Sequence, residues 1–192
     1  MAKIWPGLLL TGIVTVVVGC ANTINAVTSE PIRPNPGRTS LGTDIDDWQM
    51  DTLISVNIKK AHPQLDAAHV NVHTHNKVVL LTGEVPSAEM RSLAGDTARD
   101  FRGVRQVYNE LQIQGATTLL ARTNDNWLTT KVKSKLLANR DIESTRVMVV
   151  TENGVVYLMG LVTRGEADLI TGVASNTRGA RKVVRVFEYL DE

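Results

Sequence analysis

The chain of 192 residues is long enough for one domain or two small ones, and 43% of its residues are hydrophobic, an ordinary share for a folded protein. Its 21 basic and 20 acidic residues leave a formal net charge of +1, so the overall charge does not point to nucleic acid or to an acidic partner. Any electrostatic function must come from a local patch of charge.

The N-terminal segment has the pattern of an export signal. Lys3 precedes an apolar run from Leu8 to Val18, which is shorter than the roughly 20 residues needed to span a bilayer. The run ends at Cys20, the only cysteine, which therefore has no disulfide partner within the chain. A lipoprotein signal peptide over residues 1–19 and a lipidated Cys20 explain this arrangement. A plain signal peptide cut elsewhere and an uncleaved anchor are the alternatives.

The sequence VVGC, which ends at Cys20, resembles the lipobox of bacterial lipoproteins. By this resemblance Ala21, in place of the Asp that retains lipoproteins in the inner membrane, implies an outer-membrane address, lipid-anchored on the periplasmic face. Residues 20–45 then form a flexible tether, because proline and glycine are frequent there and apolar residues are few. Such a chain reaches roughly 25–30 Å, so the folded part can touch its own membrane.

The rest of the chain contains an internal repeat. The sequence NKVVLLTGEV at Asn76–Val85 aligns with NGVVYLMGLV at Asn153–Val162, a shift of 77 residues. With one deletion, the apolar residues of a last strand align as well: Val107, Leu111 and Ile113 with Val183, Phe187 and Tyr189. Each unit has about 65–70 residues, which is small for an independent domain and favours packing of the two units against each other.

Each unit is predicted to begin with a helix and a β-hairpin. Apolar residues recur every four positions over about 47–61 and about 126–139, which indicates two helices with one buried face. Strands with alternating apolar residues follow, and Glu152–Gly154 is a strong signal for a hairpin turn. The second strand of each unit is predicted to end in a glycine at a matched position, Gly83 or Gly160.

A second helix and a last strand complete each unit. Thr163–Glu166 has the pattern of a capping box, and Pro86–Ser87 opens the equivalent helix of the first unit. Because only one face of each strand reads as apolar, both helices are expected on that face. The predicted fold class is α+β, with two tandem α-β-β-α-β units, each a small three-stranded mixed sheet with two helices on one face.

This unit, with VVLLTGEV and VVYLMGLV around a glycine, resembles the BON domain, and two units behind a lipobox resemble the dual BON-domain outer-membrane lipoproteins of the DolP (YraP) type. The resemblance covers residues 46–190 and the leader. It implies BON domain 1 at 46–115, a linker at 116–124 and BON domain 2 at 125–192. It also implies a non-enzymatic periplasmic protein that binds anionic phospholipid through its second BON domain and supports outer-membrane integrity.

The helix within NDNWLTTKVKSKLL is predicted to begin near its asparagines and carries residues that core packing does not require. On a wheel of about 100° per residue its apolar repeat faces the sheet, and Trp127 and Leu137 fall on the opposite side. Tryptophan favours the headgroup zone of a membrane, and each lysine near an anionic surface contributes roughly 1 kcal/mol. The predicted phospholipid-binding residues are Trp127, Leu137, Lys131, Lys133, Thr130, Ser134 and Lys135, of which Lys135 borders the core face.

Two alternatives stand beside lipid contact: Trp127 packs against the first unit while the lysines form an ordinary solvated face, or the helix binds a protein partner. The first unit lacks the pattern, because Trp48 is one place out of register and acidic residues surround it. Leu53 and Val56 widen the apolar face of that helix, and we expect them to be buried against the second unit. The asymmetry predicts that one unit binds lipid and the other supports it.

No catalytic or metal-binding motif is recognised in the sequence. All four histidines lie in the first unit, and His69, His73 and His75 share one strand face, but an exposed polar face explains them better than a metal site. Phosphate loops, nucleophile elbows and zinc motifs are absent from the sequence. We therefore expect no enzyme activity, no cofactor and no metal.

Two function classes follow. The first is a lipid-anchored module that binds phosphatidylglycerol-like anionic phospholipid at the inner leaflet of the outer membrane, with lateral sorting to particular membrane sites as the hypothesis for its mechanism. Its anchor would hold the domain at high effective concentration near lipid, so weak affinity would suffice. The alternative is a periplasmic adaptor that contacts proteins of the envelope assembly or division machinery. Nucleic acid is not an expected partner.

Overall fold

The structure is a computed structural model, and it describes residues 47–114 and 119–190. The predicted signal peptide, the lipidated Cys20 and the tether lie outside the described residues. Within the two described ranges, no helix combines the length and the apolar character that crossing a membrane requires.

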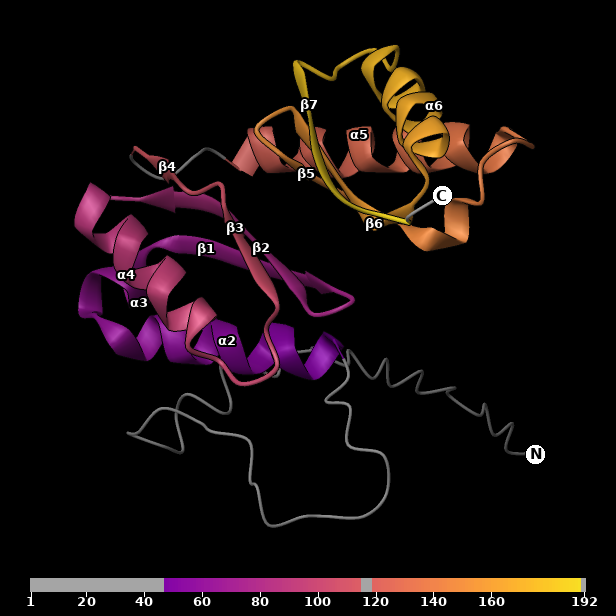
Figure 1. The fold of residues 1–192 in the computed structure, drawn as a ribbon. Coiled ribbons are helices and arrows are strands. Elements are labelled where there is room, and N and C mark those ends of the chain that lie inside the picture. Colours follow the sequence, from indigo (N-terminus) through magenta and orange to yellow (C-terminus); the bar gives the residue numbers. More distant parts are fainter. Residues whose placement is uncertain (1–46, 115–118, 191–192) are drawn as a thin grey trace, which may run out of the picture.

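Two units of similar architecture follow each other along the chain (Figure 1). The first contains α2 (Asp47–Ala61), α3 (Pro63–Ala67), β1 (His69–His75), β2 (Val78–Val85), α4 (Ala88–Arg99), β3 (Gln106–Asn109) and β4 (Gln112–Ile113). The second contains α5 (Leu119–Ala138), a 3-10 turn (Ser144–Arg146), β5 (Val147–Glu152), β6 (Val155–Val162), α6 (Arg164–Ser175) and β7 (Lys182–Tyr189). This order confirms the predicted α+β class and the repeated unit, with α3 and the 3-10 turn as additions at matched places.

Each sheet is mixed, because its central strand has an antiparallel and a parallel neighbour. β2 pairs antiparallel with β1 and parallel with β3 and β4, while β6 pairs in the same way with β5 and β7. The last strand of the first unit is interrupted at Glu110–Leu111, where the buried Leu111 enters the core. The deletion in the repeat alignment is not the cause, because it falls between Glu89 and Val107, and Val107, Leu111 and Ile113 all align with the second unit at one shift.

Both hairpins turn on residues with positive φ angles. Asn153 and Gly154 have φ angles of 49° and 72°, and Asn76 and Lys77 have φ angles of 52° and 63°. Two successive left-handed residues are the signature of the type I′ turn, whose twist matches that of the flanking strands. The hairpin predicted at Glu152–Gly154 is confirmed.

The matched glycines of the central strands have a different role from the one predicted. Gly83 and Gly160 do not end their strands, because β2 and β6 continue for two more residues. A Cβ atom on Gly83, which has a φ of +111°, would lie 2.0 Å from the carbonyl oxygen of His69, and one on Gly160 would lie 2.5 Å from that of Arg146. Glycine is therefore required there by the close approach of the neighbouring strand.

The helices of each unit cover one face of its sheet, as predicted, and each unit has its own core. The core of the first unit includes Met50, Ile54, Ile58, Leu65, Val79, Leu81, Met90 and Leu111. The core of the second unit includes Leu128, Val132, Leu136, Val149, Leu158, Ile170 and Phe187. The capping box is also confirmed, because the Thr163 and Glu166 side chains each bond the other residue's backbone N–H.

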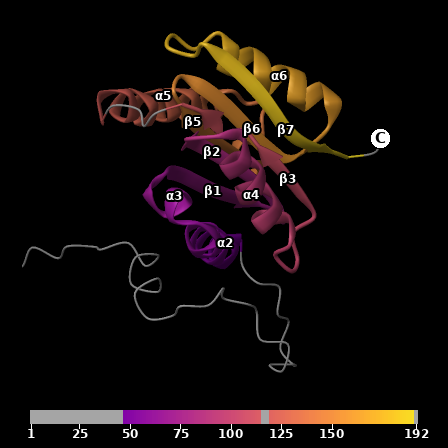
Figure 2. The ribbon, with the colours of Figure 1, turned by 90° about the vertical axis from the view of Figure 1, so that its left-hand side faces the viewer.

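The uncovered faces of the two sheets pack against each other, so the molecule has four layers in the order helices, sheet, sheet, helices (Figures 1 and 2). The apolar residues of this interface are Val78, Leu80, Tyr108, Met148, Val150, Val155, Tyr157, Met159, Val184 and Val186. The expectation that only one strand face is apolar is therefore wrong, because the central strands bury apolar side chains on both faces. Placing Leu53 and Val56 against the second unit is also wrong: α2 lies in the outer layer, and Leu53 packs into the core of its own unit.

Polar side chains cross between the units around this apolar interface. The Asn71 Nδ2 donates to Glu152 Oε2 at 2.8 Å, and the Asn153 Nδ2 donates to Glu84 Oε1 at 2.8 Å. Arg105 also forms an ion pair with Glu188. These directional contacts complement the apolar packing and favour one relative orientation of the sheets.

Helix α5 is longer than predicted. It begins at Leu119, so residues 119–124 of the predicted linker are helical, and Trp127 lies in the third turn instead of the first. Asp125, which the sequence placed near a helix start, lies within the helix and is 6% exposed.

Candidate functional site

The outer side of α5 carries a line of exposed residues. Trp127 is 62% exposed and Leu137 is 75% exposed, whereas Leu128 on the opposite side is 4% exposed. Thr130 and Ser134 lie exposed between the two apolar residues, in a spacing that keeps all four on one side of a helix. We call Trp127, Thr130, Ser134 and Leu137 the α5 ridge; at 1.5 Å per residue it is about 15 Å long.

The α5 ridge is not covered by the first unit. The interpretation in which Trp127 packs against that unit is wrong, since the two units meet through their sheets. The Thr130 hydroxyl donates to the Asn126 carbonyl oxygen at 3.0 Å, so this polar group has a partner within the helix. Its transfer out of water therefore costs less than that of an unpaired hydroxyl.

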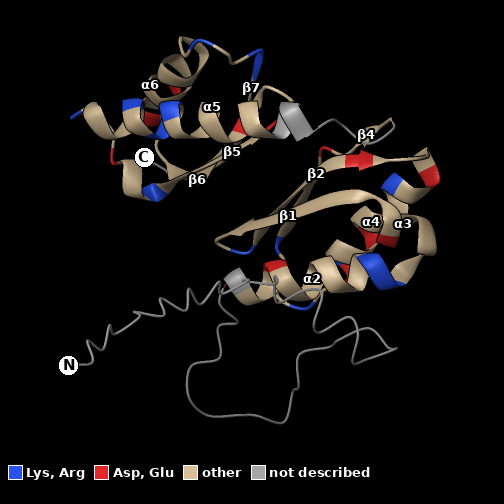
Figure 3. Cartoon of the chain, turned by 180° about the vertical axis from the view of Figure 1, so that it is seen from behind, with Lys and Arg blue, Asp and Glu red and all other residues tan. Residues whose placement is uncertain are grey.

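The three lysines of the prediction occupy three different environments. Lys131 lies beside the ridge, with its Nζ 5.1 Å from the centroid of the Trp127 ring. Lys133 is on the other flank and lines a cleft between the two units. Lys135 donates to the carbonyl oxygen of Asn176 at 3.1 Å, at the C-terminal end of α6. Figure 3 shows basic positions in the C-terminal half of α5 and an acidic position towards its other end.

Asp125 fixes α5 to the hairpin beneath it. Its Oδ2 accepts from the backbone N–H of Asn153 at 2.7 Å, and its Oδ1 accepts from that of Gly154 at 2.7 Å. Asp47 of α2 holds the Asn76–Lys77 turn in the same way. The two aspartates align the first helices of the repeats, and this clamp was not recognised in the sequence.

Two arginines that the sequence did not single out lie near the ridge. Arg178 and Arg181, from the segment between α6 and β7, line a pocket of about 520 Å³ together with Trp127 and Lys131. A signal for them existed in the repeat, because Arg102-Gly103-Val104-Arg105 aligns with Arg178-Gly179-Ala180-Arg181. Only the fold shows that this segment returns to the side of Trp127.

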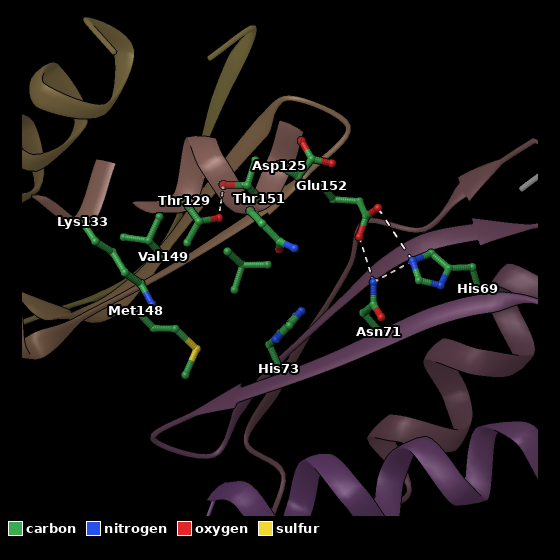
Figure 4. A pocket seen from close by; sticks show the side chains of 12 residues that line it. His69, Asn71, His73, Asp125, Thr129, Lys133, Met148, Val149, Thr151 and Glu152 are labelled. Carbon is green, nitrogen blue, oxygen red and sulfur yellow. Dashed lines mark hydrogen bonds and ion pairs between the residues drawn. The ribbon is translucent and has the colours of Figure 1, made fainter. Parts of the chain in front are cut away.

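A second cleft, of about 510 Å³, lies between the units (Figure 4). His69, Asn71 and His73 of β1 face Glu152 of β5 and Lys133 of α5 across it, so the predicted exposed histidine face is wrong for His69 and His73. Burial raises the pKa of the Glu152 carboxyl, although the hydrogen bond from Asn71 and the nearby His69 oppose this shift.

The histidines of the cleft do not complete a metal site. Burial lowers the pKa of His73, which favours its neutral form. Over the described ranges, no group of three or more His, Cys, Asp or Glu residues is placed to hold a metal ion. The cleft is lined by both acidic and basic groups, so it has no clear preference for one sign of ligand charge.

Known proteins resemble this chain over most of its length. The BON domain model matches residues 51–115 and 124–191. The chain is 35% identical over 184 residues to the outer membrane lipoprotein DolP of Haemophilus influenzae. The aligned region covers 96% of this chain and 92% of that protein. It is 35% identical over 162 residues to the 21 kDa hemolysin of Actinobacillus pleuropneumoniae, covering 84% and 81%. It is 30% identical over 139 residues to osmotically-inducible protein Y of Escherichia coli, covering 69% of each chain.

Proposed function

Since the chain belongs to the BON-domain proteins of the DolP (YraP) lipoprotein family, we propose that it is a lipid-anchored protein without enzymatic activity that binds anionic phospholipid through α5. The observation that carries this proposal is the α5 ridge, in which Trp127 and Leu137 are exposed and Lys131 lies beside Trp127. An apolar ridge with an aromatic ring and a neighbouring cation suits the boundary between lipid headgroups and acyl chains.

The expected strength of this contact is modest. Removing a leucine-sized side chain from water contributes about 1.5–3 kcal/mol, and each lysine near an anionic surface contributes roughly 1 kcal/mol. Ordering the side chains at the interface opposes part of this gain. A tethered domain needs no more, because the anchor proposed at Cys20 keeps the lipid at high effective concentration.

The relationship to an outer membrane lipoprotein supports an outer-membrane location, and we place the folded part on the periplasmic face, against the inner leaflet. There the α5 contact orients the two units, concentrates the protein where anionic lipid is enriched, and supports membrane integrity. This sorting mechanism predicts that Trp127→Glu changes the distribution of the protein around the cell. A uniform distribution of both the intact protein and the variant would contradict it.

Vesicle sedimentation of residues 21–192 tests the lipid contact. All three apolar clusters lie between Met50 and Phe187, so this form keeps the complete fold. It is compared on vesicles with phosphatidylglycerol and on vesicles of phosphatidylcholine alone. We expect binding to the anionic vesicles and its loss in Trp127→Glu.

A matched control comes from the repeat. The clamp aspartates Asp47 and Asp125 align Gln49 of α2 with Trp127, and Gln49 is exposed. Gln49→Glu introduces the same charge at the equivalent place of the other unit and is expected to leave vesicle binding unchanged. If the intact protein binds neither kind of vesicle while its thermal unfolding is normal, the lipid proposal fails. The periplasmic adaptor, for envelope assembly or division machinery, then becomes the better account.

A further inference from the structure

We propose that the pocket beside the α5 ridge binds the phosphate of an anionic lipid headgroup, with Arg178 and Arg181 as its principal cations besides Lys131. The inference rests on the proposed function and deepens it, because it assigns charge recognition to a segment outside α5. The pocket has a volume of about 520 Å³ and lies between α5, the β5–β6 turn and the segment that joins α6 to β7.

Arg181 is held in place before any ligand arrives. Its backbone N–H donates to the Gly154 carbonyl oxygen at 2.8 Å, and its guanidinium donates to the carbonyl oxygen of Asn153. A Cβ atom on Gly154 would lie 2.9 Å from the Arg181 Nε, so the glycine lets the arginine lie over the turn. Because a guanidinium has five N–H donors, further donors of this fixed group can serve an anion.

The charges that line the pocket favour an anion. Lys131, Arg178 and Arg181 are three basic groups, against one acidic group, Asp125, which gives a formal balance of +2. Both carboxylate oxygens of Asp125 accept backbone N–H groups of the β5–β6 turn, and the residue is 6% exposed. Its charge offsets one cation, but its oxygens are directed at the turn. This net positive charge favours an anion such as a phosphodiester, which carries one negative charge.

The repeat separates the structural part of this arrangement from the part that would bind a ligand. Arg105 in the first unit donates to the Asn76 carbonyl oxygen at 2.8 Å, as Arg181 does to that of Asn153. Holding the turn is therefore a shared structural role of these two arginines. Arg105 also forms an ion pair with the Glu188 carboxylate. Within the described residues, the partner of the Arg181 guanidinium is instead a main-chain carbonyl oxygen.

The second unit differs from the first in what stands beside this arginine segment. The positions of Trp127 and Lys131 are occupied by Gln49 and Leu53 in the first unit, by the alignment of the clamp aspartates. The combination of an exposed aromatic ring, a lysine and two arginines is therefore specific to the second unit. That is also the unit that carries the ridge.

The position of the pocket next to the α5 ridge favours a lipid as the source of the phosphate. Trp127 belongs both to the α5 ridge and to the wall of the pocket. A tryptophan ring at the membrane boundary lies at the depth of the headgroups, so a ridge inserted in this way brings the pocket to the phosphates. A soluble phosphate has the same chemistry, and the experiment must separate the two sources.

Arg178→Ala is the variant that tests the proposal, because Arg178 is exposed and its removal leaves intact the hydrogen bond between Arg181 and the Asn153 carbonyl oxygen. Arg102→Ala is the matched control at the equivalent exposed position of the first unit. Residues 21–192 are titrated with phosphatidylglycerol vesicles and, separately, with glycerophosphoglycerol and inorganic phosphate, while backbone amide NMR signals of Asn153, Gly154 and Gly179 are followed.

We expect Arg178→Ala to weaken binding to the anionic vesicles about fivefold, the effect of one basic residue at such a surface, and Arg102→Ala to leave it unchanged. The soluble phosphates are expected to shift the three amide signals only weakly. If Arg178→Ala binds the vesicles as the intact protein does, the inference is overturned while the α5 contact stands. Binding of soluble phosphate without vesicle binding overturns both the lipid source and the proposed function.

Discussion

Lys131 holds its Nζ 5.1 Å from the centroid of the Trp127 ring, so the cation and the largest exposed aromatic side chain of α5 form one unit. A cation over an aromatic face is attracted by the ring, by about 0.5–1 kcal/mol at an exposed site. The pair presents an apolar ring and a positive charge together at the start of the α5 ridge. This is the arrangement on which the proposed membrane contact depends.

Reversing the charge of Lys131 should weaken lipid binding strongly. Lys131→Glu removes one positive charge and adds a negative one, and at roughly 1 kcal/mol for each charge we expect a loss of roughly 30-fold on anionic vesicles. The fold should be unaffected, since Lys131 lies on the outer part of α5. Vesicle titration together with a thermal unfolding curve checks this. A variant that binds as well as the intact protein would remove Lys131 from the site.

Lys135 should behave in the opposite way, although it is four residues further along the same helix. Its ammonium donates to the Asn176 carbonyl oxygen at the C-terminal end of α6, where the helix dipole also stabilises a cation. We expect Lys135→Ala to lower the free energy of unfolding by about 0.5 kcal/mol and to leave anionic vesicle binding within twofold of the intact protein. Denaturant unfolding and sedimentation measure the two effects. A large loss of binding without a loss of stability would return Lys135 to the lipid site.

The close strand approach at Gly83 makes a strong prediction for stability. Gly83→Ala places a Cβ atom 2.0 Å from the carbonyl oxygen of His69, in a backbone conformation with a φ of +111°. We expect the free energy of unfolding to fall by about 2 kcal/mol or more. Gly165→Ala is the control, because Gly165 lies in α6 and the new Cβ would have no atom within 4 Å apart from its chain neighbours and the backbone of its own helix. That variant should be neutral or slightly stabilising. Equal stability of the two variants would contradict the strand geometry.

Asp51 should make stability depend on pH. Burial raises the pKa of its carboxyl from 3.8 to about 6, against contacts from Thr74 that lower it. Between these two values the folded protein holds a proton that the unfolded chain releases, so the free energy of unfolding falls as pH rises through this window. Asp51→Asn should therefore flatten the pH dependence and stabilise the protein above pH 6, by about 1 kcal/mol after allowing for solvent screening.

Denaturant unfolding of Asp51→Asn and of the intact protein at several pH values between 4 and 8 gives the comparison. Glu152 also has a raised pKa, caused first by burial, and contributes with the same sign, so part of the slope will remain. An unchanged slope in Asp51→Asn would mean that Asp51 titrates normally in the folded protein.

The sequence predicted the α5 ridge because helical periodicity is a local property. Once Leu128, Val132 and Leu136 were assigned to the core, the positions of Trp127 and Leu137 on the outer side followed from helix geometry alone. The start of α5 was missed because the end of a helix depends on which capping groups are used. Asp125 resembles a cap in the sequence, but its carboxylate binds the β5–β6 turn instead.

The packing of the two sheets was not predicted, although a signal for it was present. The run VVLL at the start of β2 has apolar residues on both faces, which indicates a strand buried on both sides. The prediction considered only the apolar residues on the strand face that packs against the helices. The second apolar face was therefore not recognised. The arginine pocket depends on a contact between Arg181 and Gly154 that lie far apart in the chain, and single-residue patterns do not show such contacts.

The most direct test of the membrane contact is the depth of Trp127 in a bilayer. In residues 21–192, Trp48→Phe leaves Trp127 as the only tryptophan, so its fluorescence can be followed in vesicles whose lipids carry bromine close to the headgroup. We expect a blue shift and strong quenching with phosphatidylglycerol present, and neither change with phosphatidylcholine alone. Unchanged emission on anionic vesicles that do bind the protein would contradict this expectation, because the protein would then touch lipid through another surface.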